Sequence, residues 1–214
     1  MILVGQYDSP FVRRVAVTLH HYRMPFTRDA TSVFSPKMAS VHPLVRIPSL
    51  ILDDGETLWD SVAILDYLDQ QVAPDRALTP LSGTARRGVL RATALAAGAI
   101  EKSGAIVYER HLHKPECVSR EWLERCSAQV GGALTHLNAE AQAPWFFGTA
   151  MTQADITIGC AIGYFRLRLD EVFSAQRYPK LAALAARCDA LEEFARTQPG
   201  PDELMPAKGS VTRG

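Results

Sequence analysis

The sequence predicts a fold of the α/β + all-α class, in which a small mixed unit precedes a helical bundle. Strand-like runs are concentrated in residues 1–79. Residues 73–83 are rich in proline, glycine and small polar residues, as is typical of a boundary between domains. From residue 84 onward, long alanine-rich stretches favour helices. We therefore expect domains at 1–79 and 84–198, followed by a poorly ordered tail at 199–214.

Within the first domain we expect the order strand, helix, strand, irregular link, hairpin and helix. Strand-like runs occupy residues 1–4, 26–30, 47–52 and 57–59. Ser9 is placed to cap the first helix, and Asp60 or Ser61 the second. The first helix is expected to end near residues 23–25. The apolar face of the second helix is expected to consist of Val62, Ile64, Leu65 and Leu68.

The second domain is predicted to be a helical bundle. Its expected helices occupy residues 85–108, 120–141, 152–169 and 180–196. Thr152 to Asp155 has the pattern of a capping box, with Met151 and Ile156 spaced as a hydrophobic staple. The helix that begins there is apolar almost all round, so we expect it at the centre of the bundle.

Composition excludes several classes of function. The 23 basic and 23 acidic residues cancel, so no net field draws the chain to nucleic acid or to an anionic membrane. No apolar run reaches the roughly 20 residues of a membrane helix, and the N-terminus lacks the pattern of a secretory signal. The four cysteines form no CxxC pair, which favours buried, reduced thiols in a cytoplasmic protein. His111 and His113 share no helix face, so we expect no metal site.

The first turn of the chain is a candidate anion site. Ser9 followed by Pro10 reads as an N-cap and a proline at the first helical position. A helix that starts directly after a strand presents free backbone N–H groups and the positive end of its dipole. A hydroxyl at this point lies where a bound negative charge would be stabilised. The alternative interpretation is an ordinary helix cap.

Pro48 is a second local signal, because it lies near the start of a strand-like run. Proline cannot donate a hydrogen bond to a sheet ladder. It therefore predicts an edge position or a special turn, such as one with a cis peptide bond.

Four motifs in this order and spacing resemble the cytosolic glutathione S-transferase family, in particular its bacterial branch. They are Ser9-Pro10-Phe11-Val12-Arg13, His42-Pro43-Leu44-Val45-Arg46-Ile47-Pro48, the segment 59–68 and the segment 152–156. The resemblance covers about residues 1–198. It implies a thioredoxin-like domain that binds glutathione, followed by an all-helical domain.

The sequence departs from the family pattern at three of these positions. His42 replaces the usual asparagine, Val45 replaces the usual glycine, and Asp60 stands where glutamate is commoner. None of these changes removes a charge that the family needs. Val45 is β-branched and would disfavour a backbone with positive φ.

The chemistry requires a sulfur that comes with the ligand, because the first domain contains no cysteine. Glutathione is then the co-substrate. A thiol with a pKa near 8.5 is only about 3% ionised at pH 7. Lowering that pKa by about two units, or about 2.7 kcal/mol, makes it roughly three-quarters thiolate. A hydroxyl at a helix N-terminus can supply this stabilisation. Ser9 is the preferred catalytic donor, and Tyr7 is its competitor.

The resemblance implies a set of glutathione-binding residues. They are Ser9, Phe11, Arg46, Ile47, Pro48, Asp60 and Ser61. The backbone of Ile47 would pair with the cysteinyl unit like an added strand. Asp60 would accept from the γ-glutamyl ammonium, and Ser61 with the following helix N-terminus would receive the carboxylate. Arg46 would meet the glycyl carboxylate or line the cleft. The alternatives are a solvated Arg46, a structural Pro48 and a simple cap at Asp60 and Ser61.

The second substrate would lie between the domains, against the first long helix of the bundle. Candidate residues are Tyr7, Phe11, Ile106, Tyr108, Arg110 and Tyr164. One sequence does not determine which face of the helix each occupies, and ordinary core packing is the alternative at each position.

We expect a glutathione transferase that attacks a small hydrophobic electrophile, with a role in detoxification. Two other hypotheses remain open at this stage. One keeps the thiolate but leads to peroxide reduction, isomerisation or dehalogenation, and the other is a non-catalytic ligand-binding or stress protein. The resemblance also implies a homodimer.

Overall fold

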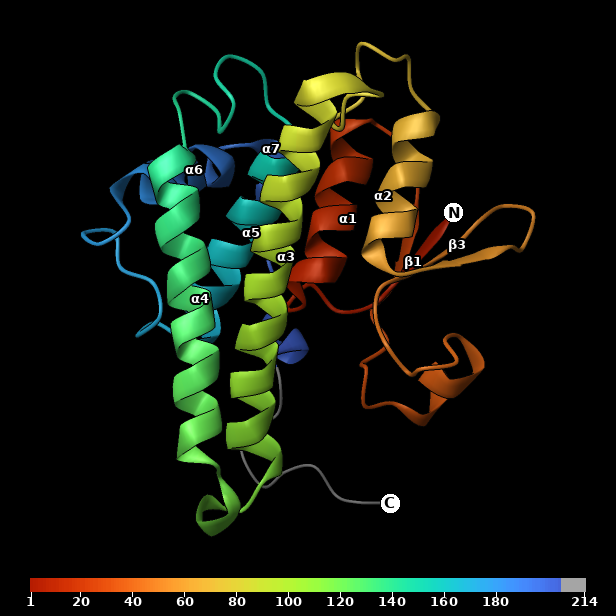
Figure 1. The fold of residues 1–214 in the computed structure, drawn as a ribbon. Helices are drawn as coiled ribbons and strands as arrows, with labels where there is room; N and C mark the ends of the chain where they lie inside the picture. Colours follow the sequence, from red (N-terminus) through yellow and green to blue (C-terminus); the bar gives the residue numbers. More distant parts are fainter. Residues whose placement is uncertain (205–214) are drawn as a thin grey trace.

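The computed structural model describes residues 1–204, and its first domain is built on a four-stranded sheet (Figure 1). The strands are β1 (Ile2–Val4), β2 (Thr27–Asp29), β3 (Ser49–Ile51) and β4 (Thr57–Trp59). Their order is β2-β1-β3-β4, with β1 and β2 parallel and the other pairs antiparallel. In this register Val4 at the end of β1 lies opposite Ser49 at the start of β3. All four predicted strands are present, and the thioredoxin-like domain followed by helices is confirmed.

Two helices of the first domain pack against the sheet. They are α1 (Pro10–His21) and α2 (Ser61–Gln70), with a short 3-10 helix η1 (Pro36–Ser40) in the link between β2 and β3. α1 ends two residues earlier than predicted, because Arg23 adopts a left-handed φ of 57°. Val62 was predicted on the apolar face of α2, but it is 60% exposed. The buried face is formed by Ile64, Leu65 and Leu68.

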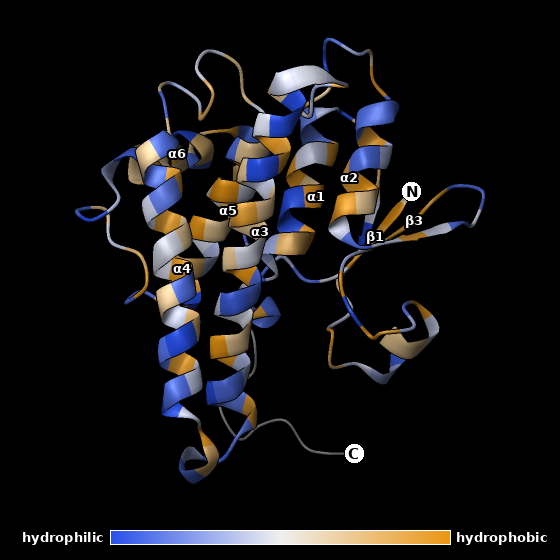
Figure 2. Cartoon of the chain, in the orientation of Figure 1, coloured by the Kyte–Doolittle hydropathy of each residue, from blue (hydrophilic) through white to orange (hydrophobic). Residues whose placement is uncertain are grey.

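The second domain is a helical bundle (Figure 1). Its helices are α3 (Gly83–Leu112), α4 (Arg120–Glu140), α5 (Gln153–Arg168), α6 (Pro179–Asp189) and α7 (Glu192–Ala195), with 3-10 turns η2 (Pro115–Cys117) and η3 (Pro201–Glu203). The largely buried α5 packs against α3 and α6, while α4 packs against α3 and α6. Figure 2 shows hydrophobic residues along α5 and alternating hydrophilic and hydrophobic bands along α4.

The helix that we predicted at 180–196 is divided in the structure. It forms two helices, α6 and α7, which are separated at Ala190 and Leu191.

The predicted capping box at the start of α5 is confirmed. The Asp155 carboxylate accepts from the backbone N of Thr152 at 2.8 Å and from the backbone N of Phe146 at 2.6 Å. Burial raises the pKa of Asp155, and these backbone hydrogen bonds oppose that rise. Because α5 packs against both α1 and α3, the cap fixes the helix that joins the two domains.

Two expectations for the rest of the chain need correction. The tail was predicted to be poorly ordered from Pro199, but η3 packs against the first domain and Glu203 is buried there. Residues 205–214 of that prediction lie outside the described part of the chain. Cys117 is exposed rather than buried, whereas Cys126, Cys160 and Cys188 are buried free thiols as expected. Within residues 1–204, the helices are all too short or too polar to cross a membrane.

Candidate active site

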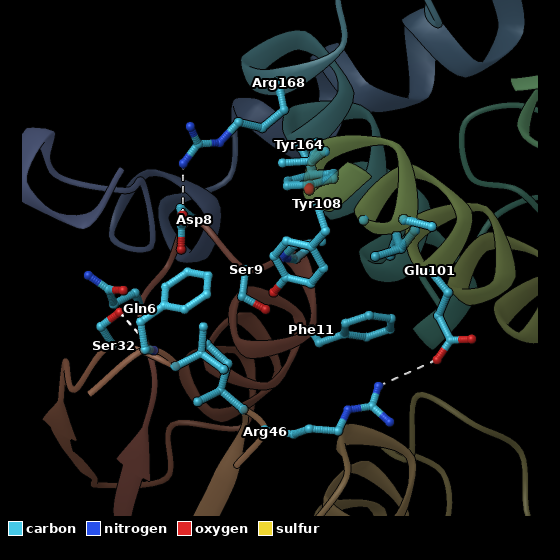
Figure 3. Close-up of a pocket in the computed structure, with 18 of the residues that line it drawn as sticks. Gln6, Asp8, Ser9, Phe11, Ser32, Arg46, Glu101, Tyr108, Tyr164 and Arg168 are labelled. Carbon is cyan, nitrogen blue, oxygen red and sulfur yellow. Dashed lines mark hydrogen bonds and ion pairs between the residues drawn. The ribbon is translucent and has the colours of Figure 1, made fainter. Parts of the chain in front are cut away.

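A cavity of about 490 Å³ lies between the two domains, where the first turn of α1 faces α3 (Figure 3). Ser9 and Phe11 line it from the first domain, while Tyr108 and Tyr164 line it from the helical domain. A second cavity of about 320 Å³ adjoins it and shares four lining residues with it. The shared residues are Phe11, Arg46, Ile47 and Glu101. The two cavities together form one cleft with two compartments.

Ser9 lies at the N-terminus of α1 and lines the larger compartment. Its Oγ accepts from the backbone N of Val12 at 3.5 Å, so the hydroxyl can still donate its own proton. Gly5 before it has φ +137°, and a Cβ there would lie 2.5 Å from Cγ2 of Val12. This turn therefore requires glycine, and it brings Ser9 close to the strand that precedes it.

The loop before Ser9 is also bound from the helical domain. Arg168, near the end of α5, donates to the Asp8 carboxylate at 2.9 Å, and both side chains are largely buried. Figure 3 shows this pair on the wall of the cavity beside Ser9. The pair ties the loop that carries the candidate donor to the domain that would bind the second substrate. Neither residue was singled out from the sequence, where they are 160 positions apart.

Tyr7, the competitor of Ser9, does not line the larger cavity. Its ring lies under the Arg28 guanidinium, with the Arg28 Cζ 3.9 Å from the ring centroid, and its side chain is buried. Its backbone N is 3.4 Å from the buried Glu203 carboxylate. Burial raises the pKa of Tyr7. Tyr7 therefore packs behind the turn and, unlike Ser9, does not line the larger compartment, where we expected it in the second-substrate pocket.

Of the other residues predicted for the second-substrate pocket on α3 and α5, some line the larger cavity and others lie on a helix face turned away from it. Tyr108 and Tyr164 line the cavity, and burial raises the pKa of both phenols. Ile106 does not line it, because that side chain is fully buried in a separate core cluster with Cys126. Arg110 does not line it either, and instead pairs with Glu171 at 2.7 Å.

Sequence reasoning missed an aromatic lining residue in the irregular link. Phe34 lies edge-to-face with Tyr108, with ring centroids 6.2 Å apart. It is 40% exposed. Because both rings line the cavity, they give its wall an aromatic character. The available sequence signal was a phenylalanine in a link that prolines break up.

The smaller compartment contains the segment before β3. The Ile47–Pro48 bond is cis, and Pro48 lines this compartment. β3 begins at the next residue and lies between β1 and β4, so Pro48 marks a special turn and not an edge. Val45 adopts φ +51° despite its branched side chain, contrary to the preference of that residue type. Arg46 reaches across the cleft to Glu101 at 3.6 Å, and both side chains are more than half exposed.

His42 packs into the same turn as a neutral acceptor. Its side chain is buried, and Nδ1 accepts from the backbone N of Leu44 at 3.0 Å. Burial, together with the nearby Arg46, lowers the pKa of His42. The ring is therefore uncharged at neutral pH, as an asparagine at this position would be.

The start of α2 forms the far wall of the smaller compartment. Asp60 has φ +69° and caps the helix, with its carboxylate accepting from the backbone N of Val62 at 2.7 Å. Ser61 is the first residue of α2 and is almost fully buried. Its Oγ accepts from Nη2 of Arg14 at 2.6 Å. Arg14 is a lining residue that the sequence interpretation did not assign.

The three buried thiols of the chain are poorly suited to ionise. Burial raises the pKa of Cys160 to about 11, and it raises the pKa of Cys126 and of Cys188. None of the four cysteines lines either compartment. Among residues 1–204, no three His, Cys, Asp or Glu side chains come together as a group that could hold a metal ion.

The fold and cleft define a class of protein: a thioredoxin-like domain whose first helix opens on an inter-domain cleft, followed by an all-helical domain. Residues 3–76 match the family profile described as "Glutathione S-transferase, N-terminal domain". Residues 120–187 match the profile described as "Glutathione S-transferase, C-terminal domain". The chain belongs to the glutathione S-transferase family.

Individual relatives agree with this assignment. A glutathione S-transferase from Methylobacillus flagellatus KT, whose crystal structure holds glutathione, has 31% identity and a TM-score of 0.87 over 93% of this chain and 99% of that one. The GST-like protein YibF of Escherichia coli K12 is 28% identical over 93% of this chain and 98% of its own length. A probable maleylacetoacetate isomerase of Drosophila melanogaster is 24% identical over 96% of this chain and 84% of its own length.

Proposed function

We propose that this protein is a glutathione transferase in which Ser9 stabilises the glutathione thiolate for attack on a hydrophobic electrophile. The observation that carries the proposal is the Ser9 hydroxyl, which caps α1 and lines the inter-domain cavity. The bound thiol would lose its proton to solvent, and the sulfur would form a bond to an electrophilic carbon. That carbon would release its leaving group with the bonding electrons. Where the reaction is an addition, the displaced electron pair would move to the neighbouring atom, which would take up a proton from solvent.

The smaller compartment would hold the peptide part of glutathione. The backbone of Ile47, beside Pro48, would pair with the cysteinyl unit. Asp60 would accept from the γ-glutamyl ammonium, and Ser61 would bind the carboxylate at the start of α2. Arg46, which lines both compartments, would meet the glycyl carboxylate and would have to leave Glu101 to do so.

The larger compartment would bind the electrophile. Phe11, Phe34, Tyr108 and Tyr164 contribute aromatic rings to its wall. Rings of this kind favour a planar, apolar substrate, because they offer a large contact area and prefer edge-to-face or offset arrangements. The pKa values of the Tyr108 and Tyr164 phenols are raised, so both keep their protons and can donate hydrogen bonds to a polar group on that substrate.

Substitution of Ser9 tests the proposal directly. Ser9→Ala should raise the pKa of the bound glutathione thiol by about one to two units, since hydrogen bonds to charged groups contribute about 1.5–3 kcal/mol. The measurement is thiolate absorbance of the complex against pH, together with turnover of a model electrophile. Tyr7→Phe is the matched control and should change neither quantity. An unchanged thiol pKa in Ser9→Ala would refute the role of Ser9.

Isomerisation is a second candidate, supported by the similarity to the probable maleylacetoacetate isomerase. Lys102 and Arg46 line the larger compartment and suit a substrate that carries carboxylates. In this case glutathione would add to the substrate and then leave it, so the tripeptide would not be consumed. Glutathione concentration before and after turnover distinguishes the two reactions.

We also propose that the protein is a cytoplasmic homodimer with a role in detoxification. The free cysteines favour a reducing compartment. Large exposed apolar side chains occur on both domains, at Trp59 and Val62 in the first and at Leu90 in the second. The first domain of one subunit would pack against the helical domain of the other. Sedimentation at micromolar concentration measures the mass of the particle and so tests whether it is a dimer.

A further inference from the structure

Arg14 is a buried cation with unsatisfied hydrogen-bonding groups. Its side chain is 1% exposed, and its Nε and Nη1 have no hydrogen-bond partner in the described part of the chain. Within the described residues, the guanidinium makes one hydrogen bond, from Nη2 to Ser61 Oγ at 2.6 Å. A buried charge is costly unless an opposite charge or hydrogen bonds compensate it. Burial lowers the pKa of Arg14 to about 10, and the nearby Asp60 opposes that change, so the group is still protonated at neutral pH.

The position of Arg14 connects this charge to the smaller compartment. Arg14 lies one turn after Phe11 on α1, and its guanidinium is 5.4 Å from the centroid of the Phe11 ring. Both residues line the compartment, as do Asp60 and Ser61 at the start of α2. A hydroxyl, a ten-residue helix N-terminus and a buried guanidinium therefore converge at one wall.

The direction of the hydrogen bond to Ser61 matters for binding. Arginine can only donate, so the Ser61 Oγ is the acceptor in this pair. The hydroxyl proton of Ser61 is then free to be donated to another acceptor. A serine held in this way presents a donor to the cavity with a positive charge behind it, and a carboxylate matches both features.

We propose that Arg14 is a positioning residue for the α-carboxylate of an amino-acid head group bound at the start of α2. It holds the Ser61 hydroxyl as a donor, and it supplies the buried positive charge that the ligand carboxylate compensates. The Asp60 carboxylate beside it suits the ammonium of the same head group. The inference rests on the proposed function, in which this head group is the γ-glutamyl end of glutathione.

The competing interpretation is that Arg14 only joins α1 to α2 and acts on stability. The chain offers a matched control in Arg13, the preceding residue of the same helix. Arg13 is 4% exposed, but its Nη2 donates to the backbone O of Phe194 in α7 and its side chain does not line the smaller compartment. Loss of either guanidinium removes a buried charge from α1. The two differ because Arg14 lines the smaller compartment, whereas Arg13 is bonded to α7.

The experiment combines these variants with a change in the ligand. Calorimetric titration is carried out on the wild type, Arg14→Gln and Arg13→Gln with two peptides. One is glutathione, and the other is 4-aminobutyryl-cysteinylglycine, which lacks only the γ-glutamyl α-carboxylate. We expect wild type and Arg13→Gln to prefer glutathione by about tenfold or more, as for a hydrogen bond to a charged group. In Arg14→Gln this preference should fall to about twofold or less, with little change in affinity for the shorter peptide.

The outcomes separate this inference from the proposed function. An unchanged preference in Arg14→Gln, or an equal loss of affinity for both peptides, overturns the role of Arg14 and leaves the transferase proposal intact. A wild type that binds glutathione with the expected preference but never ionises its thiol overturns the transferase proposal alone. Where Arg14→Gln does not fold, Arg14→Lys keeps the charge but changes the geometry of its donors. It should lower the preference at least threefold, and an unchanged preference would contradict the inference.

Discussion

We expect the Val45→Gly variant to have a higher free energy of unfolding than the Val45→Ala variant. The φ of Val45 is +51°, in a region where any Cβ is unfavourable by about 1–2 kcal/mol. Glycine has no Cβ, but it gains about 0.4–1 kcal/mol of conformational freedom in the unfolded chain relative to alanine. The difference leaves Val45→Gly about 0.5–1 kcal/mol more stable than Val45→Ala. Both variants lose the two γ-methyl groups of valine, so that loss cancels, and they differ only in the Cβ.

Leu44 provides the control for this comparison. It is the preceding residue, it is 72% exposed, and its φ is not positive. There the order should reverse, with Leu44→Ala about 0.4–1 kcal/mol more stable than Leu44→Gly. For a chain of this size, 1 kcal/mol shifts the melting temperature by about 2–4 °C. Val45→Gly should therefore melt about 1–4 °C above Val45→Ala, and the pair at position 44 should differ by a similar amount in the opposite sense.

The assay is thermal unfolding of the four variants, followed by circular dichroism at one scan rate. The reasoning fails if alanine is more stable than glycine at both positions, because the left-handed backbone at Val45 would then carry no strain. The same result would also remove an argument for the ligand site. Strained backbone tends to occur beside ligand sites, and Val45 directly precedes Arg46 and Ile47 on the wall of the cleft.

Three further substitutions test other parts of the structure. Burial lowers the pKa of His42 in the folded state, so its contribution to stability is complete above the unfolded value of about 6.5 and is lost as pH falls below it. In urea unfolding at a series of pH values, the free energy of unfolding should therefore decline more steeply from pH 7 to pH 5 in the wild type than in His42→Asn, and equal slopes would contradict the burial of a neutral ring. Gly5→Ala should lower the free energy of unfolding in urea by about 2 kcal/mol or more, because the new Cβ would meet Val12 at 2.5 Å, and an ordinary stability would contradict the close approach. Glu203→Gln removes the ion pair with Arg28 and should lower that free energy by about 1.5–3 kcal/mol; an effect below 0.5 kcal/mol would mean that the C-terminal turn does not support the first domain.

Local signals explain why the first domain could be predicted closely. A strand run and a Ser-Pro cap each depend on neighbouring residues, so they identified Ser9 as the helix cap and the start of α1 correctly. The prediction failed where distant parts of the chain decide the outcome. Val45 was expected to avoid a positive φ, but the packing around the turn overrides that preference. Glu203 follows Asp202 in a segment with no regular pattern, and its partner Arg28 is 175 positions away.

The long helix α3 shows a second kind of limit. Successive residues of a helix are about 100° apart, so Ile106 and Arg110 lie on one face and Tyr108 on another. The face of Tyr108 lines the cavity, whereas that of Ile106 packs against α4 and α5. An alanine-rich helix has weak amphipathic contrast, and the sequence therefore could not determine which face was which.

The same geometry gives α1 its place between ligand and domain interface. Arg13 and Arg14 are adjacent and both are buried, yet helical rotation sends one toward α7 and the other toward Ser61. Room for the first comes from Gly163 of α5, where a Cβ would lie 2.6 Å from Nη1 of Arg13. The helix that carries the Ser9 hydroxyl at its start is thus bonded to the helical domain by Arg13 and to the start of α2 by Arg14. A shift between the domains would move Ser9 relative to Tyr108, so the packing of α1 on α5 sets the width of the larger compartment, where we propose that the thiolate reacts.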